Sequence, residues 1–151
     1  MGFAADLAKY VDKAKLRAET VVRKTAFELQ ASVVALSPVA EQNGGRFRAN
    51  WMVGTGGIDK KTVSVTDKTG ELSLGRVENV LGTWLPGTTI YLTNSLPYAL
   101  TLEYGLYGNP PGSANGPKTS GGYSKQAQSG MVRLTVQNFR EHVRKAVRDV
   151  K

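Results

Sequence analysis

The stretch that decides the fold spans residues 3–36 and reads FAADLAKYVDKAKLRAETVVRKTAFELQASVVAL. Apolar residues recur along it at steps of three and four positions, which is the spacing of one face of an amphipathic helix. The members of this face are Phe3, Leu7, Tyr10, Ala14, Ala18, Val21, Val22, Leu29, Val33 and Leu36. No Gly or Pro interrupts the pattern, and Ser37-Pro38 ends it because the residue before a proline is pushed out of the helical region. We therefore predict one long N-terminal helix.

This predicted helix is long for a chain of 151 residues. At a rise of about 1.5 Å per residue it would extend for about 50 Å. A compact chain of this size has a diameter of only about 38 Å. The mismatch predicts either that the helix bends or breaks, or that its end packs on a neighbouring chain.

The rest of the chain predicts a small sheet with shorter helices around it. We expect strands at Phe47–Val53 and Thr88–Asn94, helices at 74–84, Pro97–Tyr104 and 130–149, and either a short strand or a loop at Lys61–Asp67. Residues 106–124 contain five Gly and three Pro, which indicates a flexible loop at about 106–123. We predict an α+β fold, in which the long N-terminal helix and a C-terminal helix pack on a small, mostly antiparallel sheet. We treat residues 1–151 as a single domain.

The composition is that of a basic protein without cysteine. The formal net charge of +8 favours acidic partners, which include nucleic acid, an anionic membrane or another protein. The absence of cysteine excludes disulfides, thiol catalysis and Cys-based zinc sites. No apolar run approaches the roughly 20 residues that span a bilayer, and no signal peptide is visible, so we expect no membrane partner.

No combination of residues predicts catalysis. Gly112–Thr119 has nearly the spacing of a phosphate-binding loop, but Pro117 stands where a backbone N–H should face the phosphate. His142 is the single histidine and cannot form a His-rich metal site. Glu103 lies in an apolar neighbourhood without a second carboxylate for acid–base catalysis, so we expect it to be a paired structural residue. We expect no enzyme, no cofactor and no metal.

The predicted terminal helix is basic. Its cations are Arg133, Arg140, Arg144, Lys145, Arg148 and Lys151. They form either a stripe that contacts DNA or a solvated face, since cations are also favoured near a helix C-terminus. Aromatic residues, which a surface for single strands would interleave, are absent apart from Phe139. The pattern favours the solvated face.

A cluster of arginine and aromatic residues is the candidate protein interface. Arg46, Arg48 and Trp51 lie close together in the sequence, and both residue types are enriched at interfaces. Packing in the core is the other interpretation of Trp51. The expected loop adds three candidates that could reach an adjacent subunit: Tyr107, Lys118 and Tyr123.

Five short segments stand out together: Ser37–Val39, Gly45–Trp51, Asn94–Ala99, Leu102–Gly105 and Ser124–Met131. In this order they resemble S-P-V-D-T-G-R-L-R-A-S-W, N-x-L-P-Y-A, L-E-Y-G and S-x-Q-A-P-x-G-M-V of tail completion (neck) proteins of long-tailed bacteriophages. The chain departs from that pattern in three places. The segment after Ser37-Pro-Val is longer and lacks the Asp, residues 106–123 are inserted, and Gln128 replaces a Pro.

The resemblance implies a structural virion protein at the neck of a siphovirus-like tail. Such proteins complete the tail and join it to the head connector as part of an oligomeric ring. The implied partners are further copies of the chain in a hexameric ring, a head-connector or stopper protein, and the tail terminator or tail tube. Passing contact with genomic DNA and synthesis in the host cytoplasm are also expected. A tail terminator of the same neck region and a small basic DNA-binding protein are the alternatives.

Overall fold

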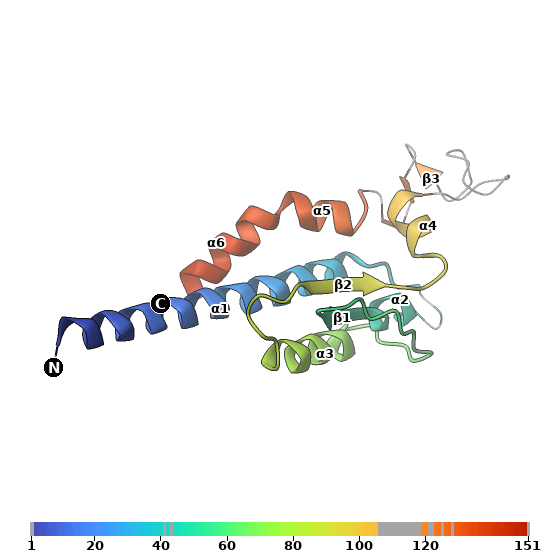
Figure 1. Ribbon diagram of the computed structural model, residues 1–151. Helices are drawn as coiled ribbons and strands as arrows, with labels where there is room; N and C mark the ends of the chain where they lie inside the picture. The colour runs from blue at the N-terminus through green and yellow to red at the C-terminus, as the bar shows by residue number, and fades with distance from the viewer. Residues whose placement is uncertain are drawn as a thin grey trace.

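A computed structural model describes residues 2–40, 42, 44–105, 119–120, 123–124, 126–127 and 129–150 of the chain (Figure 1). One helix, α1 (Phe3–Leu36), runs along the molecule, and the other elements gather on its C-terminal half. The helix is unbroken and ends at Ser37, whose ψ of 131° is extended. The predicted long helix and its end before Pro38 are confirmed.

The remaining elements are short. They are α2 (Arg46–Ala49), β1 (Trp51–Thr55), α3 (Glu71–Gly82), β2 (Ile90–Asn94), α4 (Ala99–Tyr104), β3 (Thr119–Ser120), β4 (Tyr123–Ser124), α5 (Val132–Gln137) and α6 (Phe139–Asp149). β1 pairs antiparallel with β2, so that Val53 lies opposite Leu92, and β3 pairs antiparallel with β4. The fold is α+β, with a long N-terminal helix, C-terminal helices and a small antiparallel sheet, as the sequence predicts.

Two of the predicted elements are wrong in detail. The expected strand at Phe47–Val53 begins only at Trp51, because residues Arg46–Ala49 form a helical turn. The side chain of Asn50 stabilises this turn by donating to the Arg46 carbonyl at 2.7 Å. The expected helix at 130–149 is interrupted at Asn138, whose ψ of 8° separates α5 from α6. Asn is a poor residue for a helix interior, and here its carbonyl accepts the N–H groups of Glu141 and His142 in the first turn of α6.

Two other local predictions, the helix at 74–84 and the segment at 61–67, agree with the structure. The helix expected at 74–84 is present as α3, which begins earlier because the carboxylate of Asp67 accepts backbone N–H groups of Gly70 and Leu72, each at 2.8 Å. Residues 61–67 form a loop, the second of the two alternatives. Most of the predicted flexible loop at 106–123, and with it the single-domain assignment over its full length, lies outside the described residues.

The core lies entirely against the C-terminal half of α1. One apolar cluster consists of Val33, Val34, Phe47, Trp51, Leu96, Leu102, Ala127 and Met131, and the other of Ala26, Val53, Val77 and Leu81. α5 and α6 run along one side of α1, whereas α3 and the β1–β2 ribbon lie on the other (Figure 1). Two ion pairs fasten α6 to α1, Lys24–Asp149 and Glu28–Lys145, each at 2.8 Å.

Candidate functional site

The N-terminal part of α1 has no packing partner among the described residues. Residues 2–18 are all exposed, and we call residues 3–18 the overhang. Its 16 residues would extend for about 24 Å. Phe3 is 82% and Tyr10 73% exposed, and Leu7 and Val11 are exposed beside them. These four residues, the overhang stripe, form an unburied apolar surface of the kind that marks an interaction site.

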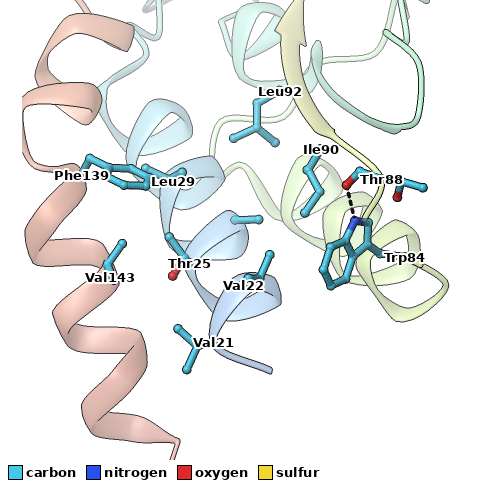
Figure 2. Close-up of a pocket in the computed structure, with 11 residues that line it drawn as sticks. Val21, Val22, Thr25, Leu29, Trp84, Thr88, Ile90, Leu92, Phe139 and Val143 are labelled. Atoms are coloured by element: carbon cyan, nitrogen blue, oxygen red, sulfur yellow. Dashed lines mark hydrogen bonds between the residues drawn. The ribbon is translucent and has the colours of Figure 1, made fainter. Parts of the chain in front are cut away.

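A second unburied apolar surface lies next to the overhang. This groove has a volume of about 360 Å³, and α1, α6 and β2 form its floor and walls (Figure 2). Its lining residues are Val21, Val22, Thr25, Ala26, Leu29, Trp84, Thr88, Ile90, Leu92, Phe139 and Val143. The indole N–H of Trp84 donates to the Thr88 carbonyl at 2.9 Å and thereby fixes one wall. The lining is almost wholly apolar, so it suits an apolar occupant.

The overhang stripe and the groove lie on one face of the same helix. Three groove residues of α1 follow three residues of the stripe by 18 positions: Val21 follows Phe3, Thr25 follows Leu7, and Leu29 follows Val11. Eighteen positions correspond to about five turns, so each pair points in the same direction. The apolar face of α1 is therefore continuous from the overhang into the groove.

One polar atom in the groove lacks a partner. The Thr25 hydroxyl is buried, and no described group accepts or donates a hydrogen bond to it. A buried hydroxyl without a partner is destabilising by about 1–3 kcal/mol. The cost falls on the α1 floor of the groove, where Thr25 lies among apolar residues.

Glu103 fastens α4 to the start of α5, and we call this arrangement the Glu103 clasp. Its carboxylate accepts the backbone N–H groups of Met131 at 2.7 Å, Val132 at 3.0 Å and Arg133 at 3.1 Å. The Arg133 guanidinium adds a bond to the carboxylate at 3.2 Å and another to the Glu103 carbonyl. The expectation that Glu103 is a paired structural residue is confirmed, with its partners on a segment far along the chain.

Gly130 makes the clasp possible. Its φ is +74°, which L side chains rarely adopt, and a Cβ built there would lie 2.4 Å from the Glu103 carboxylate. The clasp also shifts the proton equilibrium of Glu103. Burial raises its pKa, but the hydrogen bonds from Val132, Met131 and Arg133 outweigh burial and hold the pKa below the ordinary value.

The predicted interface residues Arg48 and Trp51 serve the fold of their own chain. Arg48 donates to the carbonyls of Ser37 at 3.0 Å and Ala35 at 3.1 Å, so it caps the C-terminus of α1. Trp51 is 4% exposed, and its indole N–H donates to the Ser37 hydroxyl at 2.7 Å. Both contacts explain why an Arg-x-x-Trp segment follows a helix that ends in Ser-Pro.

Among the other predicted interface residues, only the side chain of Arg46 lies within the described part of the chain. Arg46 is exposed at the start of α2. Tyr107, Lys118 and the side chain of Tyr123 lie outside the described residues. An interface role for these residues stays a prediction.

Several of the basic residues are paired within the chain. Arg133 belongs to the Glu103 clasp, Lys145 pairs with Glu28, and Arg144 pairs with Glu141 at 2.6 Å. Arg140 and Arg148 stand exposed on α6. These internal pairs reduce the charge that the terminal helices offer to a polyanion.

A family model described as "Bacteriophage HK97-gp10, putative tail-component" matches residues 2–105 of the chain. The chain belongs to the HK97-gp10-like family. It is accordingly a bacteriophage tail component, a structural part of the virion that contacts other virion proteins. The resemblance to phage tail proteins seen in the sequence is confirmed. No curated protein and no solved structure matches the chain.

Within the described ranges of the chain there is neither a candidate metal centre nor a candidate membrane span. They contain no cluster of three or more potential metal ligands. None of the helices in the described ranges combines the length and hydropathy required to cross a bilayer.

Sequence reasoning missed the groove of this HK97-gp10-like protein. Its walls come from segments far apart in the chain, with Trp84 on one side and Phe139 and Val143 on the other. The local signal was the apolar pair Phe139 and Val143, four positions apart on a helix that is otherwise mostly polar. Nothing in the sequence indicates that this pair faces β2 across α1.

Proposed function

We propose that this tail component acts at the phage neck, where it completes the tail and joins it to the head connector. In view of its resemblance to tail completion proteins, we propose that it does so as one subunit of a ring of six. The family assignment supports a structural role in the tail. The single observation that favours a role in assembly is the overhang, about half of α1, whose apolar stripe is exposed in the isolated chain. Such a helix suits a ring subunit, because neighbouring subunits can bury the exposed stripe.

The proposed partners are further copies of the chain, the head-connector or stopper protein, and the tail terminator or tail tube. We propose a structural rather than a catalytic role, in agreement with the family description. A passing contact with genomic DNA would fall to the exposed cations of α6, Arg140 and Arg148. Because Arg133, Arg144 and Lys145 form internal ion pairs, we expect this contact to be weak at physiological salt.

The test is electron microscopy of particles made by a phage that lacks this gene product. The proposal expects filled heads and separate tails of normal length that do not join. Joined, infectious particles would refute it. Complementation with the wild-type chain should restore joining, and this serves as the control.

The same micrographs separate the alternatives. A tail terminator is expected to leave tails of abnormal length, because tail growth would not stop. A DNA-binding protein is expected to leave assembly intact, and the purified chain would then bind duplex DNA with steep salt dependence. Neutralising Arg140 and Arg148 should abolish that binding in the second case and should leave head–tail joining unchanged if the proposal is right.

A further inference from the structure

We propose that the overhang of one copy docks in the groove of a neighbouring copy, with the overhang stripe against the groove lining. This inference rests on the proposed function only in assuming that copies of the chain assemble with each other. The occupant is residues 3–11 of a second copy, and the site is the pocket between α1, α6 and β2.

The dimensions of the two surfaces agree. The α1 floor of the groove runs from Val21 to Leu29, which is about 12 Å or two turns of helix. The overhang stripe runs from Phe3 to Val11, which is the same number of positions and therefore the same length. Its spacing, with anchors at Phe3, Leu7 and Tyr10, is the i, i+4, i+7 pattern by which an amphipathic helix fills an apolar groove.

The chemistry of the two surfaces also agrees. Both are apolar and exposed in the isolated chain: Val22 and Phe139 in the groove are exposed, as are all four members of the stripe. The groove has one unsatisfied polar atom, the Thr25 hydroxyl, and the stripe has one polar atom, the phenol oxygen of Tyr10. Docking would therefore bury apolar area on both copies and would leave the phenol of Tyr10 as the single polar group that the stripe brings to the groove.

Electrostatics do not oppose this docking. Residues 3–11 contain one Asp, Asp6, and one Lys, Lys9, so their formal charge is −1 + 1 = 0. On α6, the exposed cation Arg140 follows the groove residue Phe139 in the sequence, whereas Arg144 is paired with Glu141. A neutral helix can approach Arg140, and Asp6 lies between two residues of the stripe, Phe3 and Leu7.

The occupant must be a separate copy. The groove begins at Val21 on the same straight helix, so the overhang of the same chain points away from it (Figure 1). A rigid helix cannot fold back on itself within a few residues. Two copies, in contrast, can each offer a stripe and receive one.

The first experiment measures self-association of the full chain by sedimentation velocity over a range of concentrations. Leu7→Asp in the overhang and Val22→Asp in the groove are each expected to weaken association by about tenfold or more. Leu16→Asp and Val136→Asp are matched controls. Leu16 is 61% exposed but lies about two and a half turns after Leu7, hence on the opposite face, and Val136 is exposed outside the groove. Equal weakening by the control and test variants would overturn the proposal.

The second experiment uses the absence of cysteine from the chain. Single variants Tyr10→Cys and Val22→Cys are mixed and treated with a short bismaleimide, in solution and in phage particles. A cross-linked pair containing one copy of each variant is expected, and Leu16→Cys in place of Tyr10→Cys should give none. A cross-link from Tyr10→Cys to a different virion protein, or no cross-link in either preparation, would overturn the proposal.

These experiments distinguish a failure of the docking inference from a failure of the proposed function. If particles contain the chain at the neck but no cross-link between copies forms, only the docking inference fails. If phage lacking the chain still joins heads to tails, the proposed function fails, whereas a cross-link in solution would still support docking between copies.

Discussion

The two halves of α1 have the same sequence pattern and opposite environments. In the half after Val21, Ala26 is buried with residues of β1 and α3, and Val33 and Val34 are buried in the cluster around Trp51 and Met131. In the overhang, the apolar residues of the stripe are exposed to solvent. Helical periodicity therefore indicates that one face of a helix will be buried. It does not indicate whether the residues that bury this face belong to the same chain or to another one.

The largest expected effect comes from placing the same substitution in each half. Val33→Asp buries a carboxylate in the core and should lower the free energy of unfolding by more than about 4 kcal/mol. Leu7→Asp should change it by no more than about 0.5 kcal/mol, since the side chain is already exposed. Urea unfolding of both variants measures the contrast. A comparable loss of stability in the two variants would mean that the overhang packs on its own chain.

Gly130→Ala tests how much the Glu103 clasp contributes to the free energy of unfolding. The new Cβ meets the Glu103 carboxylate and must also adopt a positive φ, so we expect a loss of about 2–3 kcal/mol. Gly87→Ala is the control, because Gly87 also has a positive φ but nothing lies within 4 Å of its Cβ. It should lose only about 1–2 kcal/mol. Thermal unfolding of the pair isolates the contribution of the contact.

Glu103→Gln is expected to lower the free energy of unfolding by about 2 kcal/mol at neutral pH, because the charged acceptor of three backbone N–H groups is lost. The pKa of Glu103 is lower in the folded chain than its ordinary value of 4.5. Its stabilisation is therefore fully present above pH 4.5 and is lost as the pH falls through the folded pKa. Urea unfolding of wild type and variant should show a gap that narrows in this acid range.

A constant gap between the two proteins at all pH values would contradict the role assigned to the ionised carboxylate. Glu141→Gln is the matched control. Glu141 is an exposed helical glutamate whose partner, Arg144, is also exposed. Its removal should change neither the stability at neutral pH nor the slope in acid appreciably.

The smallest expected effect on stability follows removal of residues 1–15. Residues 2–15, the described part of the deleted segment, are all exposed, and an isolated helix of this length is marginal in water. The free energy of unfolding should therefore change by about 0.5 kcal/mol or less. Assembly, in contrast, should weaken. Chemical denaturation and light scattering of the truncated chain measure the two quantities. Normal assembly of the truncated chain would show that the overhang is dispensable.

The sequence predicted most of what depends on local order. The long helix, its end at Ser37, the strand at Ile90–Asn94 and the end of α4 at Gly105 all follow from periodicity, proline and glycine. The helical turn at Arg46–Ala49 could not be predicted, because alternating polar and apolar residues fit both a strand and this turn. Tertiary contacts of Asn50 decide between them.

The candidate site was predictable only in part. The mismatch between helix length and domain size predicted either a bent or broken helix or an end that packs on a neighbouring chain; the helix is unbroken and its N-terminal end is exposed. The groove could not be predicted, because it depends on which side of α1 receives α6 and which receives β2. The role of Trp51 was likewise open in the sequence, and only its burial assigns it to the core.

The Glu103 clasp has a consequence for how this chain can vary. It holds the end of α4 beside the start of α5, although residues 106–130 separate them in the sequence. The segment between α4 and α5 therefore begins and ends at fixed positions on the folded chain. For a flexible segment, each doubling of length between such points adds only about 0.6 kcal/mol of closure entropy. The closure cost therefore places little limit on the length of the chain between α4 and α5, and the contacts of the clasp do not depend on that length.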